Sequence, residues 1–250
     1  IKNNKYDYIF DISGRELEQT KILLENIKDD FKRYIYVSSA GVYKDLTELP
    51  LIESDPVDKN SRHKGKFETE SWLIENKIPF TSFRPTYIYG PNNYNKIENW
   101  FFERIVNLKI IPVPGDGNLI TQLGHVSDLT DVMIKCVNYD KTKNNIYNCS
   151  GDKGVTIKGL IFKCAEACNI DKNKIQLKEF DYKNLDPKSR KGFPIRLSHY
   201  QTSINKIKND INWEPKFNLV NGLKNSFEND FKFKINDNID TSSDDQLFKS

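Results

Sequence analysis

Short apolar runs alternate with amphipathic segments in the first part of the chain. Three runs are rich in aromatic and β-branched residues, as is typical of strands buried on both faces: Tyr6–Ile12, Arg33–Ser38 and Pro79–Arg84. Between them, Arg15–Lys28 and Lys66–Asn76 carry apolar residues at helical spacing. Strands that alternate with helices favour parallel pairing through right-handed crossovers. The pattern therefore predicts an α/β fold with a doubly wound parallel sheet.

The pattern becomes less regular after the third strand. Five further helices are expected, at Ile97–Leu108, Ser127–Val137, Thr156–Cys168, Ser198–Ile211 and Val220–Phe231. Three short strands are expected, at Ile110–Pro114, Asn145–Cys149 and Ile175–Phe180. Ser13 and Ser127 are the expected N-caps of the helices that follow them. We expect residues 1–155 to form the doubly wound domain and residues 156–250 a smaller C-terminal α+β lobe with a flexible acidic tail.

Composition excludes several classes of protein. With 37% hydrophobic residues in 250, the chain has enough apolar side chains for a core and is not intrinsically disordered. No apolar run approaches 18 residues, so we expect no membrane span, and no secretory leader is visible. The four cysteines show neither disulfide-scaffold density nor metal-ligand spacing, and buried thiols are expected at Cys136, Cys149, Cys164 and Cys168.

The net charge of +3 conceals an uneven distribution. One basic loop, residues 59–66, contains no acidic residue and carries Lys59, Arg62, His63, Lys64 and Lys66. A second, residues 186–196, carries one acidic residue, Asp186, beside Lys188, Arg190, Lys191 and Arg196. The end of the chain, residues 237–250, is acidic. Two cationic loops are therefore offset by an acidic tail.

Three sequence strings carry candidate chemistry. The first two lie at the carboxyl ends of predicted strands, where open α/β sheets place ligand sites, and the third follows later in the chain. They are VSSAGVY (Val37–Tyr43), RPTYIYGP (Arg84–Pro91) and GHVSDL (Gly124–Leu129). Together, in this order, they resemble the NAD-dependent epimerase/dehydratases of the extended short-chain dehydrogenase/reductase superfamily. The resemblance implies a Rossmann-like fold, a dinucleotide held by a Gly-rich loop, and hydride transfer that uses a serine, a tyrosine and a lysine.

Two departures from that superfamily argue against hydride transfer. Ser39 matches its serine and Lys66 its lysine, but Arg62 stands four residues before Lys66, where tyrosine is expected. A guanidinium does not exchange a proton near neutral pH. The only glycine before residue 41 is Gly14, so there is no Gly-rich phosphate loop, and NAD(P) binding is not expected of the chain as given. Ser39 and Tyr43 are candidates for an inherited hydrogen-bond network. For Ser39 there is an alternative, in which its side chain satisfies backbone groups at a strand end.

A tighter resemblance covers almost the whole chain. The strings FDISGRELE (Phe10–Glu18), SRHKGKFETESWL (Ser61–Leu73), PVPGDG (Pro112–Gly117) and KGFPIR (Lys191–Arg196) are similar to the family of chloroplast stem–loop RNA-binding proteins. This resemblance implies an epimerase-like fold, a plastid location, RNA as partner, association with ribosomes or transcription complexes, and divalent-metal-dependent endoribonuclease activity. Full-length members begin with a transit peptide and a first βαβ unit; neither is present here, so we expect the chain to correspond to the later part of such a protein.

The two basic loops are the expected RNA-binding residues because lysine and arginine neutralise phosphates. These are Lys59, Arg62, Lys64, Lys188, Arg190, Lys191 and Arg196. His63 is the candidate acid/base for transesterification at a 2′-hydroxyl, with Lys66, Ser39 and Tyr43 as further catalytic candidates. Magnesium would need only one or two carboxylates, which the sequence does not locate.

Other candidate residues are expected to have structural roles. His125 is expected to order the turn before its helix, His199 to lie at a helix N-terminus, and Asp128 to be structural. Trp100 and Phe101 are expected in the core rather than on a base-stacking face with Phe102. Two alternatives to an RNA-cleaving protein remain: an NAD-dependent nucleotide-sugar epimerase or dehydratase, and a non-catalytic scaffold for RNA or ribosomal particles. We expect the RNA-binding protein or scaffold to form a homo- or hetero-oligomer.

Overall fold

The computed structural model describes residues 5–27, 31–236 and 239–249 and divides the chain into two compact units. The first unit comprises Ile1–Thr86, Ser127–Asp152 and Thr202–Pro215, and the second comprises Tyr87–Val126, Lys153–Gln201 and Lys216–Ser250. Each unit is thus assembled from three separate segments, whereas the sequence suggests one boundary after residue 155.

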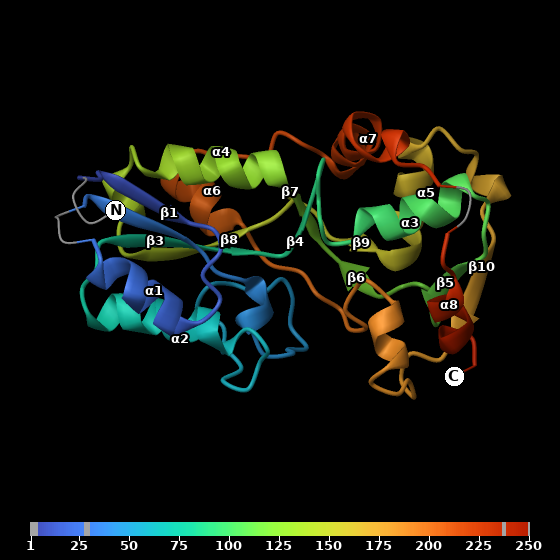
Figure 1. Cartoon of the computed structure of the whole chain (residues 1–250), viewed down its shortest axis with the longest axis horizontal. Coiled ribbons are helices and arrows are strands. Elements are labelled where there is room, and N and C mark those ends of the chain that lie inside the picture. Colours follow the sequence, from blue (N-terminus) through green and yellow to red (C-terminus); the bar gives the residue numbers. More distant parts are fainter. Residues whose placement is uncertain (1–4, 28–30, 237–238, 250) are drawn as a thin grey trace. The chain divides into compact units, whose positions relative to one another are not determined.

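The first unit is built on a four-stranded parallel sheet in the order β1-β2-β3-β8. Its strands are β1 (Tyr8–Asp11), β2 (Arg33–Val37), β3 (Phe80–Pro85) and β8 (Asn145–Cys149). Its helices are α1 (Leu17–Glu25), α2 (Lys64–Glu75), α4 (Val126–Cys136) and α6 (Asn205–Ile211), with the short 3-10 turns η1 (Ala40–Val42) and η2 (Asp140–Thr142). Figure 1 shows α1 and α2 on one face of the sheet and α4 and α6 on the other.

The central strands of this sheet, β2 and β3, are its most buried ones. Every residue of β2 and β3 is buried, as expected for parallel strands covered on both faces. Tyr34 of β2 lies in register between Ile9 and Phe80. The expectation of two buried faces is wrong for β1 among the described residues, because it forms an edge of this sheet and Phe10 is 45% exposed.

The second unit is an α+β assembly of short paired strands and helices. The pairs β4 (Tyr87–Tyr89) with β7 (Leu123–His125) and β5 (Ile111–Pro114) with β10 (Leu177–Phe180) are parallel, and β6 (Ile120–Thr121) with β9 (Val155–Thr156) is antiparallel. The helices are α3 (Glu98–Val106), α5 (Ile157–Ala167), α7 (Leu219–Asn229) and α8 (Ser242–Leu247), with 3-10 turns η3 (Lys172–Lys174), η4 (Ser189–Gly192) and η5 (Phe231–Phe233).

Aromatic side chains of α3 form much of the core of the second unit. Trp100 and Phe101 each lie edge-to-face against Phe193, with ring centres 5.4 and 6.2 Å apart. Phe102 contacts Phe227 and Phe231. The core position expected of Trp100 and Phe101 is confirmed, and Phe102 is also fully buried, so these rings are not available for base stacking.

The acidic end of the chain is docked rather than freely solvated in its described part, residues 239–249. Asp244 of α8 is 3% exposed and forms a bidentate ion pair with Arg104 of α3, at 2.6 and 2.9 Å. Leu247 is fully buried, and Lys178 lies over the ring of Phe248. The expectation of a flexible tail is wrong for these residues because the ion pair and two apolar side chains fix them; residues 237, 238 and 250 lie outside the described residues.

Helix boundaries differ from the expectation where local side chains decide them. Ser13 does not cap α1; the helix begins after Glu16, and the side chain of Gln19 accepts the Glu16 N–H, while the predicted end at Lys28 lies outside the described residues. Ser127 lies inside α4 rather than at its cap. The helix expected from Ser198 begins only at Asn205. Thr156 caps α5 through a hydrogen bond from Gly159, as its position before the apolar repeat suggests.

Candidate functional site

The loop that follows β1 folds around a carboxylate of its own. Asp11 Oδ1 accepts hydrogen bonds from the backbone N–H groups of Ser13 (3.1 Å) and Gly14 (2.7 Å), and Tyr34 donates its hydroxyl to Asp11 Oδ2. A Cβ atom at position 14 would collide with Asp11 Oδ2, so a larger residue would displace this carboxylate. The backbone donors that could hold an external anion at this strand end are therefore occupied by Asp11.

Lys66 of α2 connects the ends of two strands. Its Nζ donates to the carbonyl of Gly14 after β1 (2.6 Å) and to that of Val37 at the end of β2 (2.5 Å). The ammonium lies 4.9 Å from the centre of the Tyr36 ring, and Tyr36 donates its hydroxyl to Gly14 as well. Burial lowers the pKa of Lys66 to about 8. Two of its three N–H donors are thus used to hold main-chain groups in place.

This arrangement predicts a pH signature for Lys66. Its pKa is lowered from 10.5 to about 8 in the folded protein, so between these values the unfolded chain binds more protons than the folded one. Stability supplied through Lys66 should therefore increase as pH rises from about 8 to 10.5. We expect the difference in free energy of unfolding between wild type and Lys66→Met to grow in favour of wild type over this interval in urea titrations. A difference that is constant from pH 7.5 to 10.5 would contradict the burial of the ammonium.

Ser39 and Tyr43 both make internal hydrogen bonds. Ser39 Oγ accepts from the backbone N–H of Gly41 at 3.0 Å and caps η1, which is the structural alternative for this serine. Tyr43 is 2% exposed and donates its hydroxyl to Asn148 Oδ1 at 2.7 Å. Burial raises the pKa of Tyr43 to about 12, so the phenol remains protonated at neutral pH. Tyr43 therefore belongs to an internal network rather than to an open reaction centre.

His63 lies immediately before α2, half-buried against Gly41. A Cβ atom at position 41 would lie 2.7 Å from His63 Nε2, so the ring requires glycine beneath it. Ser61 links the same groups, donating to the Gly41 carbonyl (2.8 Å) and accepting from the His63 backbone N–H (3.1 Å). Arg62 Nε donates to His63 Nε2 at 3.0 Å. His63 Nε2 can thus take a proton from a substrate only after Arg62 releases it.

A buried ion pair beneath this segment was not expected from the sequence. Glu70 of α2 and Arg84 of β3 form a bidentate pair with a closest distance of 2.6 Å, and their side chains are 1% and 4% exposed. Ser82 donates to Glu70 Oε1 at 2.8 Å. The Arg84 guanidinium lies over the Tyr43 ring, 4.9 Å from its centre. The pair joins α2 to the sheet and supports Tyr43; helical spacing from Lys66 could have suggested that Glu70 faces inward.

Exposed cations remain on the first basic loop. Lys59, Arg62 and Lys64 are exposed, and none forms an ion pair with any residue in the described part of the chain. Each therefore keeps its positive charge available to a ligand. Lys66 donates to backbone carbonyls, and His63 accepts a hydrogen bond from Arg62. Lys59, Arg62 and Lys64 form no ion pair with a described acid.

The second basic loop belongs to the second unit. Lys188, Arg190 and Lys191 lie on or beside η4, are exposed, and have no acidic partner among residues 5–27, 31–236 and 239–249. The Asp186 carboxylate accepts from the backbone N–H groups of Lys188 and Ser189 instead. Arg196 differs, because it is half-buried and lies 4.5 Å over the ring of Tyr200.

The remaining candidates have structural surroundings. His125 is 2% exposed, with its ring stacked on Phe217 at 3.9 Å. His199 accepts the backbone N–H of Ile120 and does not lie at a helix N-terminus. Asp128 is buried in the first turn of α4. The four cysteines are free thiols, three buried and Cys168 half-buried, and burial raises the pKa of each. This confirms the expectation of buried thiols for Cys136, Cys149 and Cys164.

The family model described as NAD dependent epimerase/dehydratase matches residues 7–150, more than half of the chain. The chain belongs to the NAD-dependent epimerase/dehydratase family. Within this family, Ser39 and Lys66 hold the positions that the sequence assigns to the serine and the lysine, yet both bond to the protein's own backbone. Arg62, at the tyrosine position, has no phenolic proton to exchange.

Curated relatives include a stem-loop binding protein and nucleotide-sugar epimerases. The chain is 42% identical over 243 residues to the chloroplast stem-loop binding protein of 41 kDa b of Arabidopsis thaliana, covering 97% of this chain and 64% of that protein. It is 25% identical over 211 residues to UDP-glucose 4-epimerase of Vibrio cholerae, covering 79% and 63%. The chain thus spans less than two thirds of the length of these relatives. The first similarity confirms the resemblance seen in the sequence motifs.

Solved epimerase structures confirm the Rossmann-like fold class. UDP-glucose 4-epimerase of Thermotoga maritima has a TM-score of 0.73 at 21% identity, covering 91% of this chain and 78% of that one. UDP-N-acetylglucosamine 4-epimerase of Methanobrevibacter ruminantium has a TM-score of 0.75 at 19% identity, covering 92% and 77%. At these identities the likeness concerns the fold.

The family's dinucleotide does not fit the loop after β1. That loop offers Gly14, but the Asp11 carboxylate takes the backbone donors and would repel a phosphate. A metal site is not evident either: across the described residues there is no group of three or more His, Cys, Asp or Glu side chains that could hold an ion. Asp58, the carboxylate beside the first basic loop, accepts the backbone N–H of Asn60. We therefore derive no step through NAD(P) or a metal.

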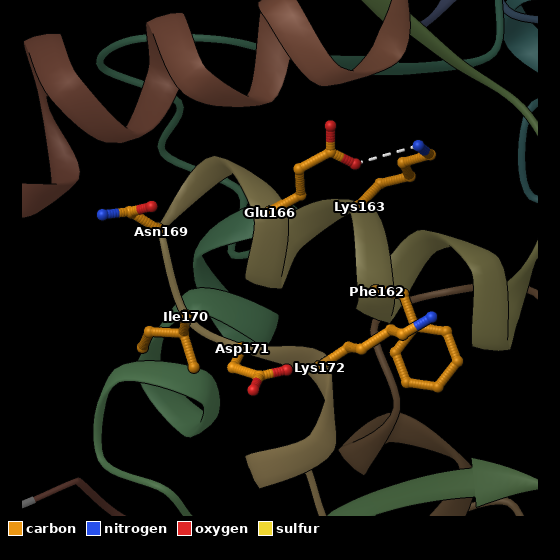
Figure 2. Close-up of a pocket in the computed structure, with 7 residues that line it drawn as sticks. All are labelled: Phe162, Lys163, Glu166, Asn169, Ile170, Asp171 and Lys172. Atoms are coloured by element: carbon orange, nitrogen blue, oxygen red, sulfur yellow. Dashed lines mark hydrogen bonds and ion pairs between the residues drawn. The ribbon is translucent and has the colours of Figure 1, made fainter.

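A hollow on the second unit offers little chemistry. Figure 2 shows its lining at the end of α5 and around η3, where Lys163 and Glu166 form an ion pair of 2.9 Å with each other. The sequence analysis selected none of the residues that line the hollow: Phe162, Lys163, Glu166, Asn169, Ile170, Asp171 and Lys172.

No helix of the described residues combines the length and apolar character that a membrane crossing requires.

Proposed function

We propose that this protein binds RNA, with stem–loop transcripts or ribosomal RNA as ligands, and acts in a plastid. The proposal is supported by similarity to a chloroplast stem-loop binding protein together with the chemistry of the site. The observation that carries it is the set of exposed, acid-free cations Lys59, Arg62 and Lys64, at the place where the family's proton-exchanging tyrosine is replaced by arginine. Cations without an acidic partner attract phosphates. The guanidinium of Arg62 does not exchange a proton near neutral pH as a tyrosine phenol could.

The second basic loop extends the proposal to the second unit. Lys188, Arg190 and Lys191 have the same properties as the first set, being exposed and unpaired with acids among the described residues, and Arg196 contributes a partly buried guanidinium. Both units would then contact RNA phosphates. Association with ribosomes or transcription complexes, and assembly into homo- or hetero-oligomers, belong to the same proposal.

Direct binding tests the proposal. We expect a fluorescein-labelled RNA stem–loop to bind in anisotropy titrations, with log K falling linearly against log salt concentration by about 0.7–0.9 per phosphate contact. Heparin should compete with the RNA because it offers a similar density of negative charge. An absence of binding at 50 mM salt, with a chain shown to be folded by circular dichroism, would overturn the proposal.

We also propose that the protein cleaves RNA as an endoribonuclease. His63 Nε2 is the candidate base that takes the proton of a 2′-hydroxyl as its oxygen bonds to the adjacent phosphorus, with Arg62 moving from His63 Nε2 to the phosphate when RNA binds. The bond from phosphorus to the 5′-oxygen then breaks, and this oxygen takes a proton from water, which gives a 2′,3′-cyclic phosphate and a 5′-hydroxyl. We expect cleavage of a stem–loop RNA in the presence of Mg²⁺, and a loss of about 100-fold or more in rate with His63→Ala while RNA affinity is largely kept. Tight binding with no cleavage, with or without Mg²⁺, would favour a non-catalytic scaffold.

A further inference from the structure

The most prominent aromatic side chain near the C-terminal end of the second unit faces solvent. Phe233 closes η5 and is 75% exposed. Exposing most of a phenylalanine ring forfeits much of the free energy that its burial would provide. The ring also lies outside both basic loops, and neither the family's chemistry nor the proposed phosphate contacts use it.

The backbone that carries Phe233 is well fixed. The Phe233 N–H donates to the Asp230 carbonyl at 3.2 Å, and the Lys234 N–H donates to that of Phe231 at 2.8 Å. Phe231 anchors the turn, since it is 4% exposed and packs against Phe102, 5.4 Å between ring centres. Phe233 is therefore displayed by a rigid turn and not by a loose end.

One lysine lies over this ring. Lys232 Nζ lies 5.1 Å from its centre, whereas Lys234, the next residue after Phe233, forms an ion pair with Asp230. Asn107, at the end of α3, donates its side-chain amide to the Asn236 carbonyl, and the exposed residue Lys109 follows Asn107 by two positions in sequence. In the described part of the chain, Lys232 and Lys109 have no acidic partner. The segment thus combines an exposed aromatic ring with a cation, Lys232, that lies over it and has no acidic partner among the described residues.

A comparison within the chain shows that exposure alone does not produce this combination. Tyr94 is even more exposed, at 82%, but it lies between Asn93 and Asn95. The nearest lysine in sequence, Lys96, is engaged in an ion pair of 2.9 Å with Glu103. Phe233 is therefore distinguished by Lys232, which lies over its ring and has no acidic partner among the described residues.

We propose that Phe233 stacks on an unpaired RNA base while Lys232 and Lys109 contact the adjacent phosphates. Sites for single-stranded nucleic acid combine aromatic faces with a positively charged track, whereas the cores of protein–protein interfaces are depleted in lysine. The inference rests on the proposed function for its ligand, RNA, and goes beyond it: the basic loops contact the backbone of any RNA, and Phe233 favours RNA that contains unpaired bases.

Two variants on two RNAs test the assignment. Phe233→Ala should weaken binding of a hairpin with an unpaired loop by about fivefold or more, the lower end of what one stacked base contributes, and leave binding of a blunt duplex of equal length unchanged. Ile235→Ala is the matched control, because Ile235 is an exposed apolar residue of the same segment (45%) without a π face, and it should bind both RNAs as wild type does. Equal losses of RNA affinity with both variants would indicate a contact that depends on apolar burial and not on stacking, and would overturn the assignment.

Fluorescence gives a readout that only direct stacking changes. In Phe233→Trp, addition of oligo(U) should quench emission by a clear margin over the wild type, whose Trp100 and Trp213 are buried and whose Trp72 is half-buried. Unchanged emission on saturation with oligo(U), or an unchanged hairpin affinity in Phe233→Ala, would overturn the stacking site while the phosphate-binding proposal stands. A wild-type protein that binds neither RNA would instead overturn the proposed function itself.

Discussion

Replacing Lys59, Arg62 and Lys64 together with alanine is expected to reduce the slope of log K against log salt by about 2 to 3 for a stem–loop RNA. Each phosphate contact releases counterions and contributes about 0.7–0.9 to that slope. The loss of three contacts should therefore lower the slope by about 2 to 3. The three side chains are exposed and form no ion pair with the described residues, so their loss should leave the fold unchanged. Anisotropy titrations at five salt concentrations between 50 and 300 mM measure the slope.

The matched control removes the same charge elsewhere on the first unit. Lys32, Lys135 and Lys141 each lie beside an aspartate, at 2.9, 3.9 and 2.8 Å. Their triple alanine variant should keep the wild-type slope, because these cations are already compensated by acids. If both triple variants lower the slope equally, net charge and not this loop governs binding, and the placement of RNA on residues 59–64 is wrong.

Arg84→Met is expected to destabilise the protein by about 3–5 kcal/mol. The substitution leaves the Glu70 carboxylate, 1% exposed, with the Ser82 hydroxyl as its remaining side-chain donor and no positive charge beside it. It also removes the guanidinium that packs on the Tyr43 ring. Urea denaturation followed by circular dichroism measures the free energy of unfolding.

Two further variants separate burial from charge. Glu70→Leu/Arg84→Met removes both charges and should recover much of the lost stability, because no uncompensated ion remains in the core. Lys32→Met breaks the exposed pair with Asp7 and should give no measurable change. A small effect of Arg84→Met, comparable with that of Lys32→Met, would show that Glu70 reaches solvent in solution.

Much of the fold follows from local pattern. The strands β2 and β3 and the helices α2, α3, α5 and α7 were predicted to within a few residues because apolar spacing is strong there. Expectations were wrong where a distant partner decides the outcome. The described part of the acidic end is ordered by the Arg104–Asp244 pair, whose members are 140 residues apart in sequence. Residues 198–204 have helical composition, but Tyr200 donates its N–H to Ile120 instead of to its own turn.

The candidate site was predictable in part. Charge counting identified the exposed residues Lys59, Arg62 and Lys64, because residues 59–66 contain no acid, and none of the three forms an ion pair with a described residue. It could not separate them from Lys66, whose Nζ is bound by the carbonyls of Gly14 and Val37. Backbone carbonyls are present at every position, so a sequence gives no sign of which ones converge on a side chain.

The sequence alone determined the family, the parallel α/β class and the replacement of a proton-exchanging tyrosine by Arg62, since each depends on residue identity and spacing. Tertiary structure alone decided which polar groups are free to act. Asp11 fills the anion position of its own loop, Tyr43 bonds to Asn148, and Phe233 is left facing solvent. The physical reason is that desolvation and hydrogen-bond satisfaction depend on groups brought together from distant parts of the chain.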